Sequence, residues 1–274
     1  MKLSAPIFFY LGLTVSSLYL GEAAFRVWSM TISQLPLRTV RAREDFQLPA
    51  GGLTGQTWPY NLASTQAALA GLDFGQLTII VGENGAGKST LIESIAEAYG
   101  LPLGGGDKRV ARPTFEAQSA FGADLQVIKG ASRCRAGLFL RAEGMLAHLE
   151  YMASLKSGQA TDILHLSHGQ GTQRLLEESA QDYGLWIMDE PESGLSFAGQ
   201  LELSARILAF LEDGGQVLLC THSPILAALA MVREEPVWEL GEWGIEERPW
   251  EDLEMTWHWR KLLTDPVAYL RHLA

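Results

Sequence analysis

The sequence predicts an α/β fold built around a mostly parallel β-sheet. Three short apolar runs carry this prediction, and they are Leu77–Val81, Leu185–Met188 and Val217–Cys220. Apolar runs of this length, bounded by glycine or polar residues, are typical of strands that are buried on both faces of a parallel sheet. Segments with helical spacing lie between them, and strands that alternate with helices form such sheets.

The other expected elements follow in chain order. Basic and apolar residues mix over Thr39–Leu48, which indicates a short edge strand, and an alanine-rich stretch over Leu62–Leu72 indicates a helix. A further helix is expected over Ser89–Tyr99, because its apolar residues recur on one face. The remaining expected elements are a strand at Ala136–Leu140, helices at Glu143–Leu155 and about Gln200–Leu211, a strand around Val237–Leu240 and a terminal helix after Pro266.

The composition is that of an ordinary globular protein. Hydrophobic residues make up 47% of the 274 residues and charged residues 19%, which excludes a chain that is disordered throughout. A chain of this length buries a sizeable core without disulfides or structural metal. Cys134 and Cys220 form no CxxC pair and have no clustered histidine, which argues against a zinc site and against a secreted disulfide scaffold.

The negative charge is concentrated near the C-terminus. The formal net charge is −11, which disfavours a protein that coats nucleic acid through charge alone. However, residues 234–254 hold nine acidic residues and a single basic one, Arg248, so the rest of the chain is nearly neutral. Residues 104–141 contain seven basic and three acidic residues. We interpret this basic region as a solvated surface rather than a phosphate-contacting patch, although the charge balance does not exclude a nucleic-acid partner.

The segment Gly82–Thr90, GENGAGKST, fits the pattern GxxxxGK[ST] and lies between an expected strand and an expected helix. Glycines let main-chain N–H groups face phosphate oxygens, and the start of the helix adds its positive end. Lys88 is expected to reach the β- and γ-phosphates and Ser89 to ligate Mg²⁺. The pattern predicts a P-loop nucleoside triphosphatase with nucleotide contacts from Gly82, Glu83, Asn84, Gly85, Ala86, Gly87, Lys88, Ser89 and Thr90.

Two acidic residues and a histidine follow the other buried strands. Asp189 and Glu190 come directly after Leu185–Met188, and His222 comes shortly after Val217–Cys220. Open α/β sheets bind their ligands at the carboxyl ends of the strands. We therefore expect Asp189 to hold Mg²⁺, Glu190 to act as the general base on the attacking water, and His222 to contact the γ-phosphate.

Together these motifs resemble the ATP-binding-cassette (ABC-type) ATPases. Leu166–Gln170, LSHGQ, is similar to that family's LSGGQ signature, and Ser193–Ser196 is similar to its D-loop. The order also agrees, from phosphate loop to signature to acidic pair to histidine. Within the family, GLFLRAEGM at Gly137–Met145, the signature core and LTDPVAYLRHL at Leu263–Leu273 resemble small stand-alone bacterial ATPases.

The resemblance implies a fold, two ligands and a partner. The fold is an ABC-type core with an antiparallel edge and a small helical subdomain at about 107–180. ATP and Mg²⁺ bind between two copies of the chain, with Ser167, Gly169 and Gln170 of one copy facing the nucleotide of the other. The family's Q-loop glutamine has no clear counterpart, and Glu143 stands at about its place as a possible metal contact.

The base of the nucleotide is less well defined. The aromatic residue that stacks on adenine in transporter cassettes has three candidates here, Phe46, Trp58 and Tyr60, and no feature decides between them. No guanine-reading NKxD motif follows a strand, so adenine rests on the resemblance. Five tryptophans lie within residues 234–259, and we interpret them as packing residues rather than a ligand cage.

The apolar N-terminus has three interpretations. Residues 5–21 carry no charge, which fits an export signal, a membrane anchor or a start codon placed upstream of the true start at Met30. Glu22 makes a poor cleavage site, and ATP chemistry belongs in the cytoplasm. We therefore favour Met30 as the true start. Residues 1–29 are then a separate segment, and residues 30–274 form one ATPase domain. We expect a cytoplasmic protein, which is membrane-associated if the segment is an anchor.

Three functions fit an ATPase of this type. The first is a protein without its own membrane domain, in which ATP clamps a homodimer and hydrolysis opens it. The motifs do not identify the protein target on which this dimer acts. The second is the nucleotide-binding subunit of a transporter. The third is an ATP-gated nucleic-acid-binding protein of the repair or chromosome-maintenance type, which is less favoured because only residues 82–189 separate the two nucleotide motifs, too few for a long coiled-coil insertion.

Overall fold

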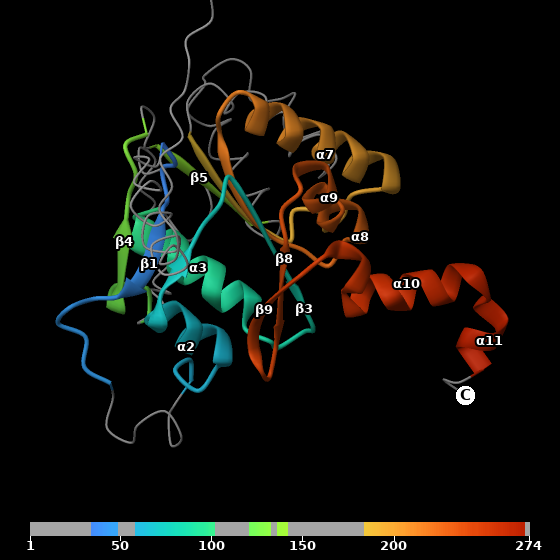
Figure 1. Cartoon of the computed structure of the whole chain (residues 1–274), viewed down its shortest axis with the longest axis horizontal. Helices are drawn as coiled ribbons and strands as arrows, with labels where there is room; N and C mark the ends of the chain where they lie inside the picture. The colour runs from blue at the N-terminus through green and yellow to red at the C-terminus, as the bar shows by residue number, and fades with distance from the viewer. Residues whose placement is uncertain (1–33, 49–57, 102–120, 133–135, 142–183, 272–274) are drawn as a thin grey trace, which may run out of the picture. The chain divides into compact units, whose positions relative to one another are not determined.

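In a computed structural model of the chain, two β-sheets and the helices packed on them form the fold (Figure 1). The structure describes residues 34–48, 58–101, 121–132, 136–141 and 184–271. The chain divides into residues 1–32 and residues 33–274, and every described residue lies in the second unit. The helix expected at Glu143–Leu155 and the N-terminal apolar segment lie outside the described residues.

The larger sheet has six strands among the described residues, in the order β5-β6-β7-β3-β8-β9. Their bounds are β3 Leu77–Gly82, β5 Gly137–Arg141, β6 Leu185–Asp189, β7 Gln216–Cys220, β8 Val237–Gly241 and β9 Gly244–Arg248. All neighbouring pairs are parallel except β8 and β9, which form an antiparallel hairpin. The three apolar runs are therefore neighbouring parallel strands, as the sequence predicts.

Helices cover both faces of this sheet (Figure 1). Their bounds are α2 Ala63–Ala70, α3 Lys88–Tyr99, α7 Phe197–Glu212, α8 Pro224–Ala227 and α9 Leu229–Arg233. Alternate residues of a strand point to opposite faces. In β6, Trp186 and Met188 pack with α7, α8 and α9, whereas Ile187 packs with α3. The sheet is thus buried on both sides, which explains why its strands are apolar throughout.

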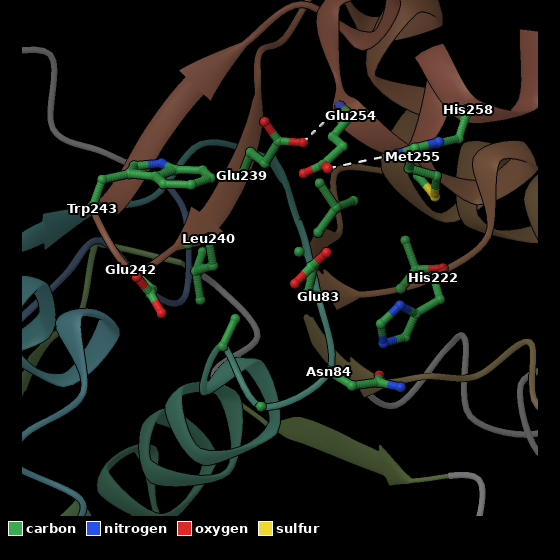
Figure 2. Close-up of a pocket in the computed structure, with 16 residues that line it drawn as sticks. Glu83, Asn84, His222, Glu239, Leu240, Glu242, Trp243, Glu254, Met255 and His258 are labelled. Carbon is green, nitrogen blue, oxygen red and sulfur yellow. Dashed lines mark hydrogen bonds and ion pairs between the residues drawn. The ribbon is translucent and has the colours of Figure 1, made fainter. Parts of the chain in front are cut away.

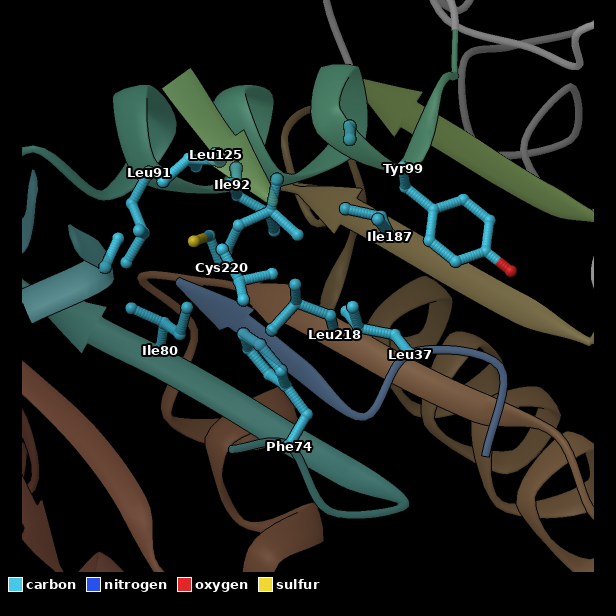
Figure 3. Close-up of a cluster of buried hydrophobic side chains, with 14 of the residues drawn as sticks. Leu37, Phe74, Ile80, Leu91, Ile92, Tyr99, Leu125, Ile187, Leu218 and Cys220 are labelled. Atoms are coloured by element: carbon cyan, nitrogen blue, oxygen red, sulfur yellow. The ribbon is translucent and has the colours of Figure 1, made fainter. Parts of the chain in front are cut away.

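The second sheet is antiparallel and consists of three described strands in the order β2-β1-β4. Their bounds are β1 Thr39–Ala42, β2 Leu72–Asp73 and β4 Leu125–Ile128, preceded by the 3₁₀ turn η1 Gly122–Asp124. Apolar side chains of this sheet, among them Leu125, join those of α3 and of the larger sheet in one buried cluster (Figure 3). Helix α3 therefore has packed neighbours in both sheets.

The range 107–180, expected to form a helical subdomain, is described only in part. Its described residues, 121–132 and 136–141, hold strands β4 and β5 and the 3₁₀ turn η1; the other residues of the range lie outside the described part of the chain, and the subdomain stays a prediction. Leu125 is buried while the rest of β4 is half-buried, so the strand shows neither an apolar run nor a clear alternation. Pairing with β1 determines its structure.

The C-terminal part consists of η2 Trp250–Asp252, α10 Glu254–Thr264 and α11 Pro266–Arg271. Figure 1 shows α10 and α11 extending away from the sheets. Trp238 is buried and Trp250 donates a hydrogen bond to the carbonyl of Pro224, as packing residues do. Trp243, Trp257 and Trp259 are exposed, so the packing interpretation is wrong for these three. Within the described residues, none of the helices combines the length and the apolar composition that crossing a bilayer requires.

Candidate functional site

The predicted site residues meet at the carboxyl edge of the larger sheet. Register brings them together, because Cys220 lies opposite both Ile80 and Asp189 on its two neighbouring strands. The loop after β3, the end of β6 and His222 after β7 therefore emerge side by side. This is the edge at which open α/β sheets bind ligands.

The phosphate loop needs glycine at positions 82 and 87, both because of the backbone conformation and because of close neighbouring atoms. Gly82 and Gly87 have φ angles of 148° and 90°, which L-residues rarely adopt. A Cβ atom at Gly82 would lie 2.4 Å from the carbonyl oxygen of Leu240, and one at Gly87 would lie 2.5 Å from Oγ of Ser64. The loop thus follows a path that only these glycines permit.

The start of α3 is open to an anion. Gly87 is the N-cap residue of this helix and provides no side-chain cap for the first N–H groups. Uncapped N–H groups at a helix N-terminus bind phosphate oxygens, and the helix dipole adds positive charge there. Lys88 is a second source of positive charge at this point, and its side chain is buried, with only 4% exposed. Its Nζ donates to the carbonyl oxygens of Gly82 and Glu83 at 2.8 and 2.9 Å, and burial lowers its pKa.

Ser89 and Asp189 present two hard oxygen atoms to one point. Ser89 Oγ donates to Asp189 Oδ1 at 3.2 Å. Adjacent ligands of an octahedral Mg²⁺ ion lie about 2.9 Å apart, because each metal–oxygen bond is about 2.05 Å long. The pair therefore fits two neighbouring positions of such an ion, and Mg²⁺ normally takes its other ligands from water and phosphate.

Asp189 is buried, with 4% of its surface exposed, and this burial raises its pKa to about 6. The positive charge of Arg141 and the hydrogen bond from Ser89 act in the opposite direction, whereas the negative charge of Glu93 raises the pKa further. A carboxyl group in this state gains most from a bound cation, because the cation restores the solvation that burial removed.

Arg141, which the charge pattern of residues 104–141 places on a solvated surface, lies at the site instead. It lies opposite Asp189 in the β5–β6 register, and its Nε is 4.0 Å from Asp189 Oδ2. Its Nη1 forms an ion pair with Glu93 on α3. The available signal was its place directly after the apolar run of β5, which puts it at the same sheet edge as the acidic pair.

Glu190 and His222 form a direct pair. His222 Nε2 lies 3.3 Å from Glu190 Oε1. The backbone of Glu190 has a φ angle of 48°, a left-handed conformation that is uncommon outside glycine, and its N–H donates to the carbonyl of Cys220. Strained residues of this kind are frequent at functional sites. The expected base and the expected γ-phosphate contact are thus neighbours.

Glu192 and Gln200 hold the segment around His222 in place, and no motif of the sequence points to either residue. The backbone N–H of His222 donates to Glu192 Oε1 at 2.6 Å. The next residue, Ser223, donates to Gln200 Oε1 on α7 at 2.6 Å and accepts hydrogen bonds from the first N–H groups of α8. Gln200 lies shortly after the expected D-loop, Ser193–Ser196, where Ser196 caps α7. These contacts connect the D-loop segment to the histidine.

Several predicted residues are not covered by the structure. Glu143 and the signature residues Ser167, Gly169 and Gln170 lie outside the described residues.

Of the seven basic residues in 104–141, two are described. Lys129 lies 3.8 Å from the centroid of the Tyr99 ring, and Arg141 pairs as above. Asn84, Gly85 and Ala86 line one cavity with His222 (Figure 2), and Thr90 lies in the first turn of α3.

Comparison with known proteins identifies the family. A family model described as an AAA domain matches residues 68–130. The cytochrome c biogenesis ATP-binding export protein CcmA of Bradyrhizobium diazoefficiens is 32% identical over 171 residues, covering 56% of this chain and 83% of the relative. The CcmA protein of Rhodopseudomonas palustris (strain BisB18) is 30% identical over 181 residues, covering 60% and 88%.

Among solved structures, a metal-chelate type ABC transporter in an inward-facing conformation matches with a TM-score of 0.41 and 16% identity, over 84% of this chain and 90% of that chain. The sequence relatives establish the class. The chain belongs to the ABC-type P-loop ATPases, which bind ATP and hydrolyse it.

Proposed function

We propose that the protein is a Mg²⁺-dependent ATPase in which ATP closes two copies of the chain into a dimer and hydrolysis reopens it. The observation that carries the proposal is the convergence of Lys88, Ser89, Asp189, Glu190 and His222 at one edge of the sheet. These residues supply the groups that phosphoryl transfer to water requires.

Each side chain has a distinct part in the reaction. The loop and Lys88 bind the phosphates and orient the γ-phosphorus. Glu190 accepts a proton from water while the water oxygen forms its bond to phosphorus, and the electron pair of the broken bond stays on the bridging oxygen of ADP. His222 donates a hydrogen bond to the γ-phosphate, and its contact with Glu190 orients the base at the same time. When held by Ser89 and Asp189, Mg²⁺ supplies positive charge against the phosphate oxygens.

The dimer follows from the resemblance to ABC-type ATPases. Ser167, Gly169 and Gln170 of one copy would face the γ-phosphate held by the other, so neither copy completes the site alone. Glu143 is a further candidate contact to the metal. Hydrolysis removes the phosphate that both copies share, and the clamp then opens.

A second candidate function is that of a transporter subunit. The observation in its favour is that the relatives at 30–32% identity are named export proteins. In that case the dimer would act on a separate membrane protein. A nucleic-acid function has less support, because both described cations of the basic region contact groups of the same chain.

The test compares Glu190→Gln with wild type. Without its base this variant should hydrolyse ATP about 10²- to 10⁴-fold more slowly and still bind it. Size-exclusion chromatography should then show a dimer with Mg-ATP and a monomer without nucleotide. Lys88→Ala is the matched control, because it keeps the base but should lose nucleotide binding and dimerisation.

Two results would contradict the proposal. Normal hydrolysis by Glu190→Gln would remove the general-base role of this residue. A Glu190→Gln protein that binds Mg-ATP and stays monomeric over a range of protein concentrations would remove the dimer.

A further inference from the structure

Arg141 ends β5 beside Asp189, the proposed ligand of Mg²⁺. The two residues are register partners in parallel strands, so their side chains leave the sheet on the same face. Two residues earlier in each strand, Phe139 and Ile187 belong to the buried cluster that packs on α3 (Figure 3). Because the side chains of a strand alternate between the two faces, Arg141 and Asp189 also lie on the α3 side of the sheet.

Helix α3 presents two polar side chains to this pair. Ser89 and Glu93 are four residues apart, and residues at this spacing lie on one face of a helix. Ser89 donates to Oδ1 of Asp189, and Glu93 accepts from Nη1 of Arg141. Nε of Arg141, which lies 4.0 Å from Oδ2 of Asp189, closes a network of four side chains. Two members of this network come from the sheet and two from the helix.

The network gives the two carboxylate oxygens of Asp189 different neighbours. Oδ1 lies beside the hydroxyl of Ser89, and Oδ2 faces the guanidinium of Arg141. The torsion potential of a carboxylate about χ2 is broad, so the side chain alone does not fix the plane of its oxygens. A cation beside Oδ2 fixes that plane and leaves Oδ1 for the metal. This matters for Mg²⁺, because it requires near-ideal octahedral geometry.

Glu93 offsets the charge that Arg141 brings to the site. A cation beside a metal ligand attracts the carboxylate, but it also repels Mg²⁺. Here the guanidinium forms an ion pair with Glu93, so the pair is neutral as a whole. Burial raises the pKa of Asp189, and of the two neighbouring charges Arg141 lowers this pKa while Glu93 raises it. Arg141 is therefore able to hold the carboxylate without excluding the metal.

We propose that Arg141 is a positioning residue for the Mg²⁺ site, and that it acts by holding the carboxylate of Asp189 in the orientation that binds the metal. This proposal rests on the proposed function, because it requires Asp189 to be a ligand of Mg²⁺. Groups that hold a metal ligand from behind typically contribute about 10- to 100-fold to metal affinity or activity.

The test measures how strongly Mg²⁺ stabilises the protein in the absence of nucleotide. Urea unfolding at pH 8 over a series of MgCl₂ concentrations gives the free energy of unfolding of wild type, Arg141→Ala and Arg141→Lys. Its increase with Mg²⁺ reports the affinity, because a ligand that binds only the folded state stabilises that state. Arg141→Ala should need about 10- to 100-fold more Mg²⁺ than wild type for the same increase. Arg141→Lys should recover part of the affinity, because its ammonium group holds one carboxylate but does not bridge two.

Arg43→Ala is the matched control. Arg43 directly follows β1 in the smaller sheet, and it also forms an ion pair with a nearby carboxylate, that of Asp45, at 2.9 Å. Its loss should leave the response to Mg²⁺ as it is in wild type.

The outcomes separate a positioning role from a structural one. If Arg141→Ala is less stable at every Mg²⁺ concentration but responds to Mg²⁺ as wild type does, the ion pair is only structural and the proposal is overturned. An Arg141→Lys variant with no more affinity than Arg141→Ala would also contradict it, because a cation would then not be what orients the carboxylate. Failure of the proposed metal site has a different signature, which wild type and Asp189→Asn report: either Mg²⁺ does not stabilise wild type, or it stabilises both proteins equally.

Discussion

Asp189 is the residue at which burial and the proposed function conflict most directly. Its carboxyl group is almost fully buried, and the pKa rises to about 6 even though Arg141 and Ser89 favour the charged form. A folded protein near neutral pH therefore carries a buried negative charge that costs stability. We expect the same property to make Asp189 a strong ligand for a cation, since metal binding would compensate for the lost solvation.

Replacing Asp189 by Asn should stabilise the protein above pH 6 and abolish Mg²⁺-dependent hydrolysis. The pKa is raised on folding, so the stability that the protonated group contributes is complete below about pH 4 and is lost as pH rises through about 6. At pH 8 the variant should unfold with a free energy about 1–3 kcal/mol higher than wild type. At pH 4 the two should be nearly equal.

Urea unfolding without metal at pH 4, 6 and 8 measures this difference. A gap between wild type and Asp189→Asn that does not change with pH would show that the charge of Asp189 is not the cause. Adding Mg²⁺ at pH 8 should narrow the gap by stabilising wild type alone.

At the scale of elements, the buried parallel strands could be predicted and their contacts could not. Strands β3, β6 and β7 are apolar because helices cover both faces, and that pattern is readable in one sequence. The register between neighbouring strands cannot be read from one sequence. The pairing that brings Arg141 opposite Asp189 is therefore seen only in the structure. The exposure of Trp257 could not be predicted from the sequence either. An aromatic residue in a helix usually packs on a core, but α10 extends away from the sheets.

Helix α10 depends on one carboxylate of the neighbouring hairpin. Glu239 on β8 accepts a hydrogen bond from the N–H of Glu254 at 2.9 Å, which caps the first turn of α10. Glu239→Ala should therefore destabilise the protein by about 1 kcal/mol, the usual cost of a lost N-cap acceptor. Glu239→Gln retains the accepting oxygen and should lose less.

Urea unfolding monitored by tryptophan fluorescence measures both variants. Equal stability of Glu239→Ala and wild type would show that α10 does not need this cap. Equal losses in the Ala and Gln variants would instead assign the effect to the charge of Glu239, which pairs with Arg248.

At the scale of the described molecule, the site lies where the two cores meet. The larger sheet separates a cluster packed on α7 to α9 from a cluster packed on α3, and the strands that end at the site contribute to both. Cys220 shows the connection, because its side chain belongs to the α3 cluster and contacts the carbonyl of Lys88. A ligand that holds the loop, β6 and β7 together therefore stabilises the whole fold.

Mg-ATP should consequently raise the melting temperature of Glu190→Gln, in which the nucleotide is bound but turns over slowly. A ligand at 100 times its Kd stabilises a folded protein by about 2.7 kcal/mol. In a domain of this size that corresponds to an increase in Tm of about 5–10 °C. Lys88→Ala should show no increase under the same conditions, because its loop lacks the cation that holds the phosphates. Differential scanning calorimetry at several ATP concentrations checks both, and an equal increase in the two variants would place the nucleotide away from the phosphate loop.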